Sequence, residues 1–319
     1  MKRTIAILLV GVSLSAASPA FAADPITLSG DISVKYERDS ADGDPAVSGA
    51  MYSLKLKAEK YLGAGWSLYG RLGAQYATQP ALSDYNTDPA VYGPNRKSVG
   101  AIDQFGFTYE ADDAVYKIGR QDVAIGTTAL LYSRPYTNIG KHGFVDGITA
   151  AGTVGIVDLS AVIVQEDNPG SQDNKIYAIR TGFNPTKSLN WGLTLGRYQD
   201  SANGNTNHWA VDGAYKFGNS TLTGEYAKSS ANSDNKAYAA IWNYGFDDKT
   251  AGYITYFRVE TNGDMGKQSD FDNGNKGIYY GVTYKLTDAD NLEFVYKDQK
   301  IISTGQKNTK FEATFTHSF

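Results

Sequence analysis

The sequence has no cysteine among its 319 residues, so no disulfide framework can hold the fold. After its first residues it has no apolar run of about eighteen residues, which excludes a bundle of membrane-spanning helices. Lys and Arg total 30 against 34 Asp and Glu, with no basic block, so nucleic acid is not an expected partner. Motifs for metal, cofactor or catalytic residues are also missing. A soluble β protein and a membrane β-barrel remain.

The chain begins with the features of a secretory signal peptide. Residues 1–22 read MKRTIAILLVGVSLSAASPAFA, with two basic residues, a short apolar run and a small-residue site ending at Ala22. The apolar run is too short to span about 30 Å of hydrocarbon, which argues against a membrane anchor. We expect cleavage after Ala22, leaving 23–319 as a single barrel domain.

Aromatic residues make up 13% of the chain and Gly is abundant at 34 residues, a composition that favours strands and turns. Period-two alternation recurs in stretches separated by turn-forming clusters, and helical periodicity is almost missing. The predicted strands are 26–38, 49–61, 66–77, 98–110, 114–121, 145–153, 157–166, 174–183, 189–200, 206–217, 220–229, 235–246, 250–259, 276–286, 291–301 and 307–319.

Short connections alternate with mostly longer, more polar ones, which predicts one rim of tight turns and one of loops. Bacterial transmembrane barrels have short periplasmic turns, longer external loops and an even number of strands. The sixteen predicted strands satisfy that parity. The expected fold class is all-β, a 16-stranded antiparallel transmembrane β-barrel.

One face of each predicted strand is apolar. A soluble sandwich would show the same alternation, so the composition of the apolar face has to decide. It carries aromatic residues near the strand ends and small or aliphatic residues near the middle, which is typical of interfacial girdles around a hydrocarbon band. Charges on it, such as Arg197 and Lys228, occur only near strand ends. In 66–77 the apolar face is Trp66, Leu68, Gly70, Leu72, Ala74 and Tyr76.

The last predicted strand alternates in the same way and ends on Phe319. An amphipathic final strand with a carboxyl-terminal Phe resembles the signal that barrel-assembly machinery recognises in bacterial outer-membrane proteins. That resemblance implies assembly of this chain by such machinery, in contact with outer-membrane lipid.

The segment 116–121, Tyr-Lys-Ile-Gly-Arg-Gln, precedes a long connection at 122–144, and Gly-Phe-Val-Asp-Gly-Ile follows at 143–148. These motifs resemble the Gram-negative trimeric porins. The resemblance implies that 122–144 is an external loop folded into the lumen, where it sets the constriction. Only Asp122 and Asp146 flank the loop, fewer carboxylates than the family often has, so its selectivity does not carry over.

The loop composition points inward independently. Residues such as Val123, Ile125, Leu130 and Leu131 are too apolar for a loop in water, and the inner barrel wall is available to cover them. Packing over a neighbouring subunit is the alternative.

Strand parity places both basic and acidic residues on the inner face, so a transverse field across the pore is expected rather than a ring of one sign. Many of these charges serve only to keep a lumen hydrated. The predicted pore-lining and constriction residues are Lys55, Arg71, Lys117, Arg134, Arg180 and Arg258.

A homotrimer is expected, with contacts through the first strands and the last. The first predicted strand and the sixth and seventh have small and aliphatic residues outward, whereas later strands present Trp and Tyr, which mark headgroup contact. The aromatic residues counted there are Trp191, Trp209, Trp242, Tyr253, Tyr280 and Tyr296.

The expected function is passive diffusion of ions and small hydrophilic solutes through a wet pore, because sixteen strands enclose an aqueous channel. A substrate-selective sugar or anion channel is the alternative, with Tyr69, Tyr256 and Tyr279 as inward aromatic residues. An outer-membrane hydrolase would need a Ser, a His and an acid to converge, and no Gly-x-Ser-x-Gly context accompanies the three histidines. An adhesive barrel would need a further domain, for which the chain leaves no room.

Overall fold

The computed structural model describes residues 25–85, 95–169 and 173–319. The predicted signal peptide, 1–22, lies outside the described residues. Within them, no helix has the length and apolar character needed to cross a membrane.

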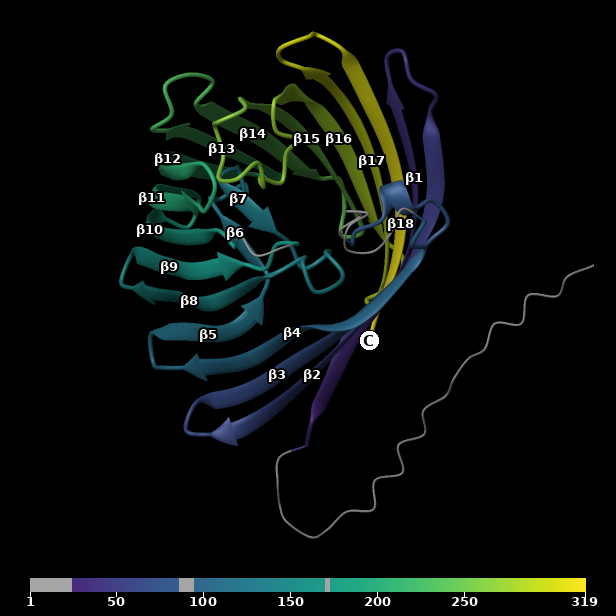
Figure 1. Ribbon diagram of the computed structural model, residues 1–319. Coiled ribbons are helices and arrows are strands. Elements are labelled where there is room, and N and C mark those ends of the chain that lie inside the picture. The colour runs from purple at the N-terminus through teal and green to yellow at the C-terminus, as the bar shows by residue number, and fades with distance from the viewer. Residues whose placement is uncertain (1–24, 86–94, 170–172) are drawn as a thin grey trace, which may run out of the picture.

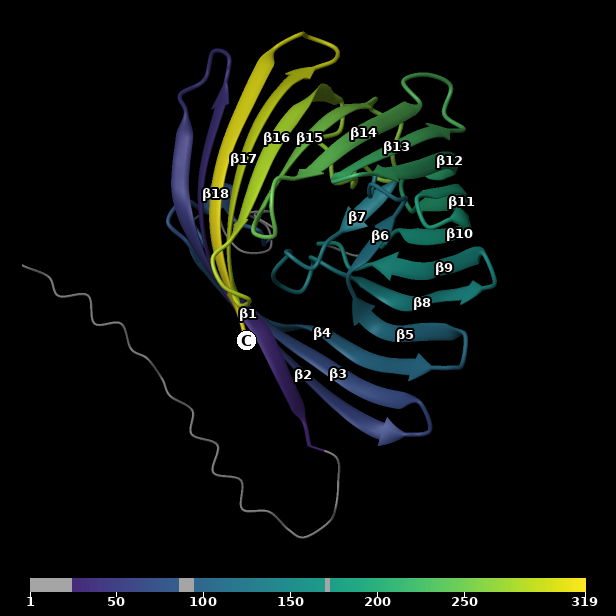
Figure 2. The same cartoon turned by 180° about the vertical axis from the view of Figure 1, so that it is seen from behind.

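Sixteen antiparallel strands form a closed barrel, in which every wall strand pairs with its neighbours along the chain and β1 pairs with β18 (Figures 1 and 2). The predicted fold class is confirmed, and most predicted boundaries are within a few residues of the observed ones. The wall strands are β1 (Thr27–Ala41), β2 (Val47–Gly63), β3 (Trp66–Ala77), β4 (Ser98–Glu110), β5 (Ala114–Gln121), β8 (Val145–Val154), β9 (Val157–Glu166), β10 (Lys175–Thr186), β11 (Leu189–Asp200), β12 (Gly204–Phe217), β13 (Ser220–Ser229), β14 (Lys236–Gly245), β15 (Thr250–Val259), β16 (Asn275–Lys285), β17 (Asp290–Ile301) and β18 (Lys307–Ser318).

The two ends of the chain close the sheet. In the β1–β18 register Asp31 lies opposite Ser318, and Gly30 and Phe319 exchange backbone hydrogen bonds of 2.9 and 3.0 Å. Phe319 therefore belongs to the last rung of the ladder, on the rim of short turns. Closure leaves the sheet without an edge strand.

The polarity of the barrel is the reverse of that of a soluble core. On β3, Leu68 and Tyr76 are 44% and 46% exposed, whereas Arg71 and Gln75, which point inward, are 1% and 3% exposed. Trp, Leu, Ile and Tyr side chains are exposed in the same way around the whole outer face. The alternation in the sequence thus corresponds to an apolar outside and a polar inside.

A β-bulge interrupts the β3–β4 ladder. Arg71 lies opposite Gln104 and Leu72 lies opposite Ile102, so Asp103 is the extra residue. A bulge re-aims the side chain at its position. Here it turns Asp103 inward beside Gln104, and both side chains are buried.

Three longer connections depart from simple loops. The connection 78–97 begins with a short 3-10 helix, η1 (Pro80–Leu82). The connection 122–144 contains a two-stranded hairpin, β6 (Val123–Ile125) paired with β7 (Tyr132–Arg134), which the sequence did not predict. Both views show this hairpin inside the ring of wall strands (Figures 1 and 2). The third, 260–274, joins β15 to β16.

Candidate functional site

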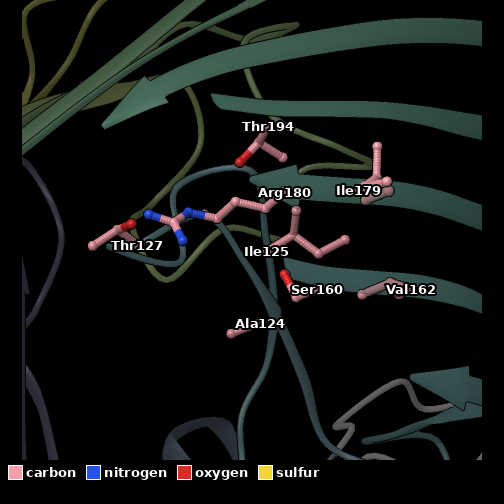
Figure 3. Close-up of a pocket in the computed structure, with 10 residues that line it drawn as sticks. Ala124, Ile125, Thr127, Ser160, Val162, Ile179, Arg180 and Thr194 are labelled. Carbon is pink, nitrogen blue, oxygen red and sulfur yellow. The ribbon is translucent and has the colours of Figure 1, made fainter. Parts of the chain in front are cut away.

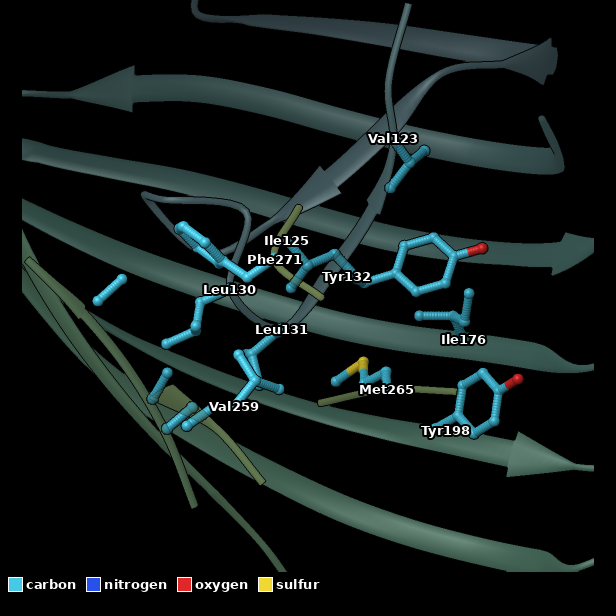
Figure 4. Close-up of a cluster of buried hydrophobic side chains, with 14 of the residues drawn as sticks. Val123, Ile125, Leu130, Leu131, Tyr132, Ile176, Tyr198, Val259, Met265 and Phe271 are labelled. Atoms are coloured by element: carbon cyan, nitrogen blue, oxygen red, sulfur yellow. The ribbon is translucent and has the colours of Figure 1, made fainter. Parts of the chain in front are cut away.

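The β6–β7 hairpin packs on the inner wall through apolar side chains (Figure 4). Leu130, Leu131 and Tyr132 are completely buried. The wall beneath them includes four alanines, whose small side chains let the hairpin come close. The buried wall residues of this cluster include Ile176 of β10, Ala210 of β12, Ala227 of β13, Ala237 and Ala239 of β14, and Phe257 and Val259 of β15.

Hydrogen bonds to two wall carboxylates fix the tip of the hairpin. Thr128 donates from its backbone nitrogen and its hydroxyl to Glu225 Oε2, at 2.7 and 2.8 Å. Thr127 donates to Asp212 Oδ1 at 2.5 Å. Gly126 has a φ of 96°, and a Cβ there would lie 2.1 Å from Glu225 Oε1. Only glycine combines that backbone conformation with so close an approach.

The connection 260–274 covers the other side of the hairpin. Met265 N donates to Leu131 O at 2.8 Å, and Asp270 N donates to Ala129 O at 3.1 Å. A further backbone bond joins Ser133 N to Gln268 O. Met265 is completely buried against the same apolar cluster. Two of the longer connections, 122–144 and 260–274, therefore form one body inside the barrel.

Asp264 organises this second connection from a buried position. Its carboxylate accepts hydrogen bonds from Ser269 N at 3.1 Å and from Asn273 Nδ2 at 2.7 Å. Burial raises the pKa of Asp264 to about 6, although these hydrogen bonds act in the opposite direction. Burial also raises the pKa of Asp270 in the same connection. Both carboxyls thus hold a proton more readily in the folded connection than in water.

Arg71 anchors the base of the 122–144 connection. Its guanidinium makes two 2.8 Å hydrogen bonds to Asp103, one from Nε and one from Nη2. It also donates to the carbonyls of Tyr136 and Asn138 at 2.6 and 2.8 Å. The rings of Tyr136 and Phe144 lie 4.7 and 4.6 Å from its Cζ. Every face of this side chain is therefore occupied.

Lys55 lies beside this anchor on β2. Its ammonium is 3.0 Å from Asp31 Oδ1 and 5.2 Å from the centre of the Tyr136 ring. Like Arg71, it points inward but is buried, at 6% exposure.

Arg134, at the end of β7, fixes the far side of the connection. Its Nη1 donates to the carbonyls of His142 and Phe144 at 2.9 and 3.0 Å. Its Nη2 donates to Asn168 Oδ1 at 2.8 Å and lies 3.7 Å from Glu166 Oε1. The guanidinium of Arg134 thus binds groups within the protein and holds the end of the connection in place.

Arg180 and Lys117 are the predicted cations that point inward and keep part of their side chains exposed. Arg180 donates to both oxygens of Asp212, at 3.1 and 2.5 Å, and retains 22% side-chain exposure. It borders a cavity of about 180 Å³ between the hairpin and the wall (Figure 3), together with Thr127, Ser160 and Thr194. Lys117 is 2.9 Å from Asp122 and retains 29% side-chain exposure.

The inward placement of Arg258 is wrong. Arg258 lies opposite Lys276, and Tyr256, two residues earlier, lies opposite Ala240 and Ile278 on the outer face. The inward residues of β15 are instead Tyr253, Thr255, Phe257 and Val259, so Tyr253 was also assigned to the wrong face. Aromatic residues stand on both faces of this strand, which removes the contrast that period-two reasoning needs.

The sequence reasoning missed several residues that organise the interior. Glu225 and Asp103 were not recognised as loop anchors, although two consecutive polar residues within 98–110, Asp103 and Gln104, could have indicated a bulge. The inward fold of 260–274 was also missed. Met265 and Phe271, apolar residues in a polar connection, were the available signal. Within the described ranges, no cluster of His, Asp and Glu could hold a metal ion.

No family model and no curated protein sequence matches this chain. Solved structures do match, 245 chains in all. A triple mutant of Rhodopseudomonas blastica porin has a TM-score of 0.61 at 12% identity, over 92% of this chain and 100% of that one. An engineered protein described by its asymmetric conductivity gives the same values. A variant of the same porin with charged residues replaced by alanine has a TM-score of 0.60 at 11% identity, with the same coverage. At these identities the likeness shows the fold, which is that of a porin barrel.

Replacing Arg71 by Met should lower the free energy of unfolding by about 3–5 kcal/mol, because Asp103 would stay buried without its counter-charge. The double variant Arg71→Met/Asp103→Leu should be more stable than the single variant, since it leaves no unpaired charge. Lys57→Met is the matched control, because the Lys57–Glu59 pair is about 40% exposed and such pairs contribute at most about 1 kcal/mol. Urea unfolding in neutral detergent measures all three. Equal effects of Arg71→Met and Lys57→Met would contradict the anchoring role.

Acidification from pH 7 to pH 5 should tighten the 260–274 connection. The pKa of Asp264 is raised in the folded connection, so protonation of its carboxyl stabilises the folded form. This stabilisation is complete at a pH below the pKa of an ordinary aspartate, and it is lost as the pH rises through about 6. Amide exchange in 260–274, corrected for the intrinsic rate, should slow by about tenfold. Asp264→Asn should remove most of this change, and Asp234→Asn, in another external connection, should not. Faster exchange at pH 5 would show that the sign is wrong.

Proposed function

We propose that this protein is a bacterial outer-membrane porin, a channel for passive diffusion of ions and small hydrophilic solutes. One observation carries the proposal: the barrel is closed, its outer face is apolar, and the charged residues in the middle of its strands point inward. A closed barrel satisfies every backbone hydrogen bond within the sheet, as a hydrocarbon environment requires. An outer face with so many exposed Leu, Ile and Trp side chains is incompatible with bulk water.

The distribution of outward charges supports the same environment. A Lys or Arg at the lipid midplane costs about 2–4 kcal/mol, and the cost falls toward the interfaces. The corrected position of Arg258 is outward, but it lies next to the last residue of β15, where the cost is small. The outward Lys228 is likewise next to the last residue of β13, and the outward Arg197 lies three residues before the end of β11.

The inner wall opposite the hairpin carries charges of both signs with water access. Lys297 and Glu312 form a 2.9 Å ion pair with side-chain exposures of 24% and 16%. Lys35 contacts Asp84 at 2.7 Å on the same side. Hydrated pairs of this kind suit a transverse field that orders ions without binding them tightly.

The predicted site residues divide into two roles in this proposal. Lys117 and Arg180 line the water path, because they keep part of their side chains exposed. The other three cations, Lys55, Arg71 and Arg134, are buried, and their role is to hold the 122–144 connection, which sets the constriction. A loop anchored by buried charges keeps the pore at a constant width.

A substrate-selective channel receives less support. Tyr256 faces outward, and Tyr69 and Tyr279 are buried at 3% and 7% exposure, so these three rings cannot form a sugar track. An enzymatic role has no positive support either. His142 lies in an external connection, His208 on the inner wall of β12 and His317 at the turn-side end of β18.

The proposal includes a homotrimer in outer-membrane lipid, assembled through the C-terminal strand by barrel-assembly machinery. Outward aliphatic side chains on β1, β8 and β9 support the trimer, since Ile32, Ile148 and Ile163 are about half exposed. Phe319, in the last rung of the barrel, remains accessible at 51% exposure for recognition at the turn-side rim. Native mass spectrometry in neutral detergent measures the stoichiometry, and a monomer as the only species would reject the trimer.

In planar bilayers the purified protein should show ohmic conductance without an energy source. Lys117→Glu and Arg180→Glu should each shift the reversal potential in a salt gradient toward cation preference. A two-unit charge change about 8 Å from the ion path amounts to about 1 kcal/mol in water, or a roughly fivefold change in permeability ratio at low salt. Lys187→Glu, the same change at a turn outside the lumen, should have no such effect. Absence of conductance would refute the proposed function, and equal shifts in all three variants would refute the assignment of the lining.

A further inference from the structure

A cavity of about 180 Å³ lies between the β6–β7 hairpin and the inner wall of the barrel (Figure 3). The residues that enclose it are mostly small. On the wall these are Ser160 of β9, Ala178 of β10 and Thr194 of β11, and on the hairpin they are Ala124 and Gly126. A cavity of about 150 Å³ can hold a molecule of the size of benzene, so this one has room for a solute of about six non-hydrogen atoms.

The strand register gives the cavity a polar and an apolar side. Ser160, Arg180 and Thr194 lie directly opposite one another across β9, β10 and β11, and they form the polar side. Two residues nearer the external connections, Ala178 lies opposite Val162, and both pack against the apolar cluster beneath the hairpin. A solute in the cavity therefore meets hydrogen-bonding groups on one side and carbon on the other.

The charge of Arg180 is already balanced within the wall. Its Nε and Nη2 donate to Asp212, whose side chain is completely buried. Glu225, directly opposite Asp212 across the register, is a further buried carboxyl. An anion in the cavity would thus find no uncompensated positive charge, and a cation would lie against the guanidinium. Because transfer of an ion from water into a confined site without a counter-charge is costly, the cavity suits an uncharged solute.

The polar side still has groups that can bind a solute. Thr194 is completely buried, and within the described residues its Oγ1 has no hydrogen-bond partner. Nη1 of Arg180 makes no hydrogen bond to a described residue either. Figure 3 shows the hydroxyls of Ser160 and Thr194 on either side of the Arg180 side chain. A buried hydroxyl without a partner is unfavourable, and a solute hydroxyl, which both donates and accepts, would pair with it.

We propose that this cavity binds small uncharged polyols of about the size of glycerol. The inference names a class of solute for the channel function proposed above and rests on that function, because a solute reaches the cavity from the lumen. Ala124 and Thr127 border the cavity and are exposed. The hydroxyls of a polyol meet the polar side, and its carbon chain lies against Val162 and Ala178. Water would satisfy the polar side only.

The first test compares three probes that match in size and differ in charge, namely glycerol, lactate and protonated 2-amino-1,3-propanediol. Binding to the purified protein in neutral detergent is titrated by saturation-transfer NMR of the probe. Wild type should bind glycerol at least about fivefold more tightly than either ion, because each ion would lose hydration without gaining a counter-charge. Equal binding of glycerol and lactate overturns the assignment to uncharged solutes.

The second test changes the polar side of the cavity. Thr194→Val removes the hydroxyl with little change of shape, so it should weaken glycerol binding about tenfold. Without glycerol its melting temperature should equal or exceed that of wild type, because the unpaired hydroxyl is gone. The matched control is Thr255→Val, at a buried inner-wall position of β15 outside the cavity, which should bind glycerol as wild type does. Equal binding by Thr194→Val and wild type overturns the role of the polar side.

Ala178→Leu fills the cavity and should abolish glycerol binding, whereas Ala151→Leu, at an inner-wall position of β8 outside the cavity, should leave it unchanged. Equal binding by wild type and Ala178→Leu overturns the cavity as the site, and a wild type without saturable binding overturns the inference as a whole. Conductance in planar bilayers is recorded for the same samples. Conductance without glycerol binding rejects the cavity site alone, whereas glycerol binding without conductance rejects the channel function alone.

Discussion

Every other feature of this molecule depends on the pairing of β1 with β18. That ladder runs from Asp31 and Ser318 to Ala41 and Asn308, and it turns a sixteen-stranded sheet into a cylinder without edges. An open sheet of this length would expose two rows of unpaired backbone groups. Hydrocarbon offers such groups no hydrogen-bond partner, and in water they would pair with the edge of another chain. Once the sheet is closed, successive side chains along every strand point alternately to the outside and into the lumen. The reversed polarity of the barrel follows from closure together with the alternation.

The interior is held by a mixture of interactions that differs from an ordinary apolar core. Arg71, itself paired with Asp103, holds the base of the 122–144 connection, and the hydrogen bonds from Thr128 to Glu225 hold the tip of its hairpin. Apolar packing of the β6–β7 hairpin on alanines of β12, β13 and β14 holds the middle of this connection. The charged anchors determine where the connection lies, because a charge left unpaired there is costly. The apolar contacts hold the hairpin against the wall.

Charge has a different role at each level of the barrel. Within the lumen, opposite charges are paired across short distances, as in Lys297 with Glu312. On the outer face, charges are excluded from the middle of the strands and appear at their ends. At the loop-side ends of β15–β18 four cations lie directly opposite one another across the register, and Glu260 and Asp298 form ion pairs with two of them, Arg258 and Lys307.

Local pattern in the sequence was enough to determine the number of wall strands, most of their boundaries and the face of most residues, because period-two alternation and turn residues act over a few positions. It failed where alternation carried no contrast, as in β15, whose aromatic residues occupy both faces and whose Arg258 and Tyr256 point outward. Only the tertiary structure decided that Arg71 is an anchor with no free surface, because its partners Asp103, Tyr136 and Asn138 come from a bulge and a distant connection. It also decided that 260–274 folds onto the hairpin and that four cations meet in one row. Such contacts depend on the register between strands and on chain closure, which no local pattern encodes.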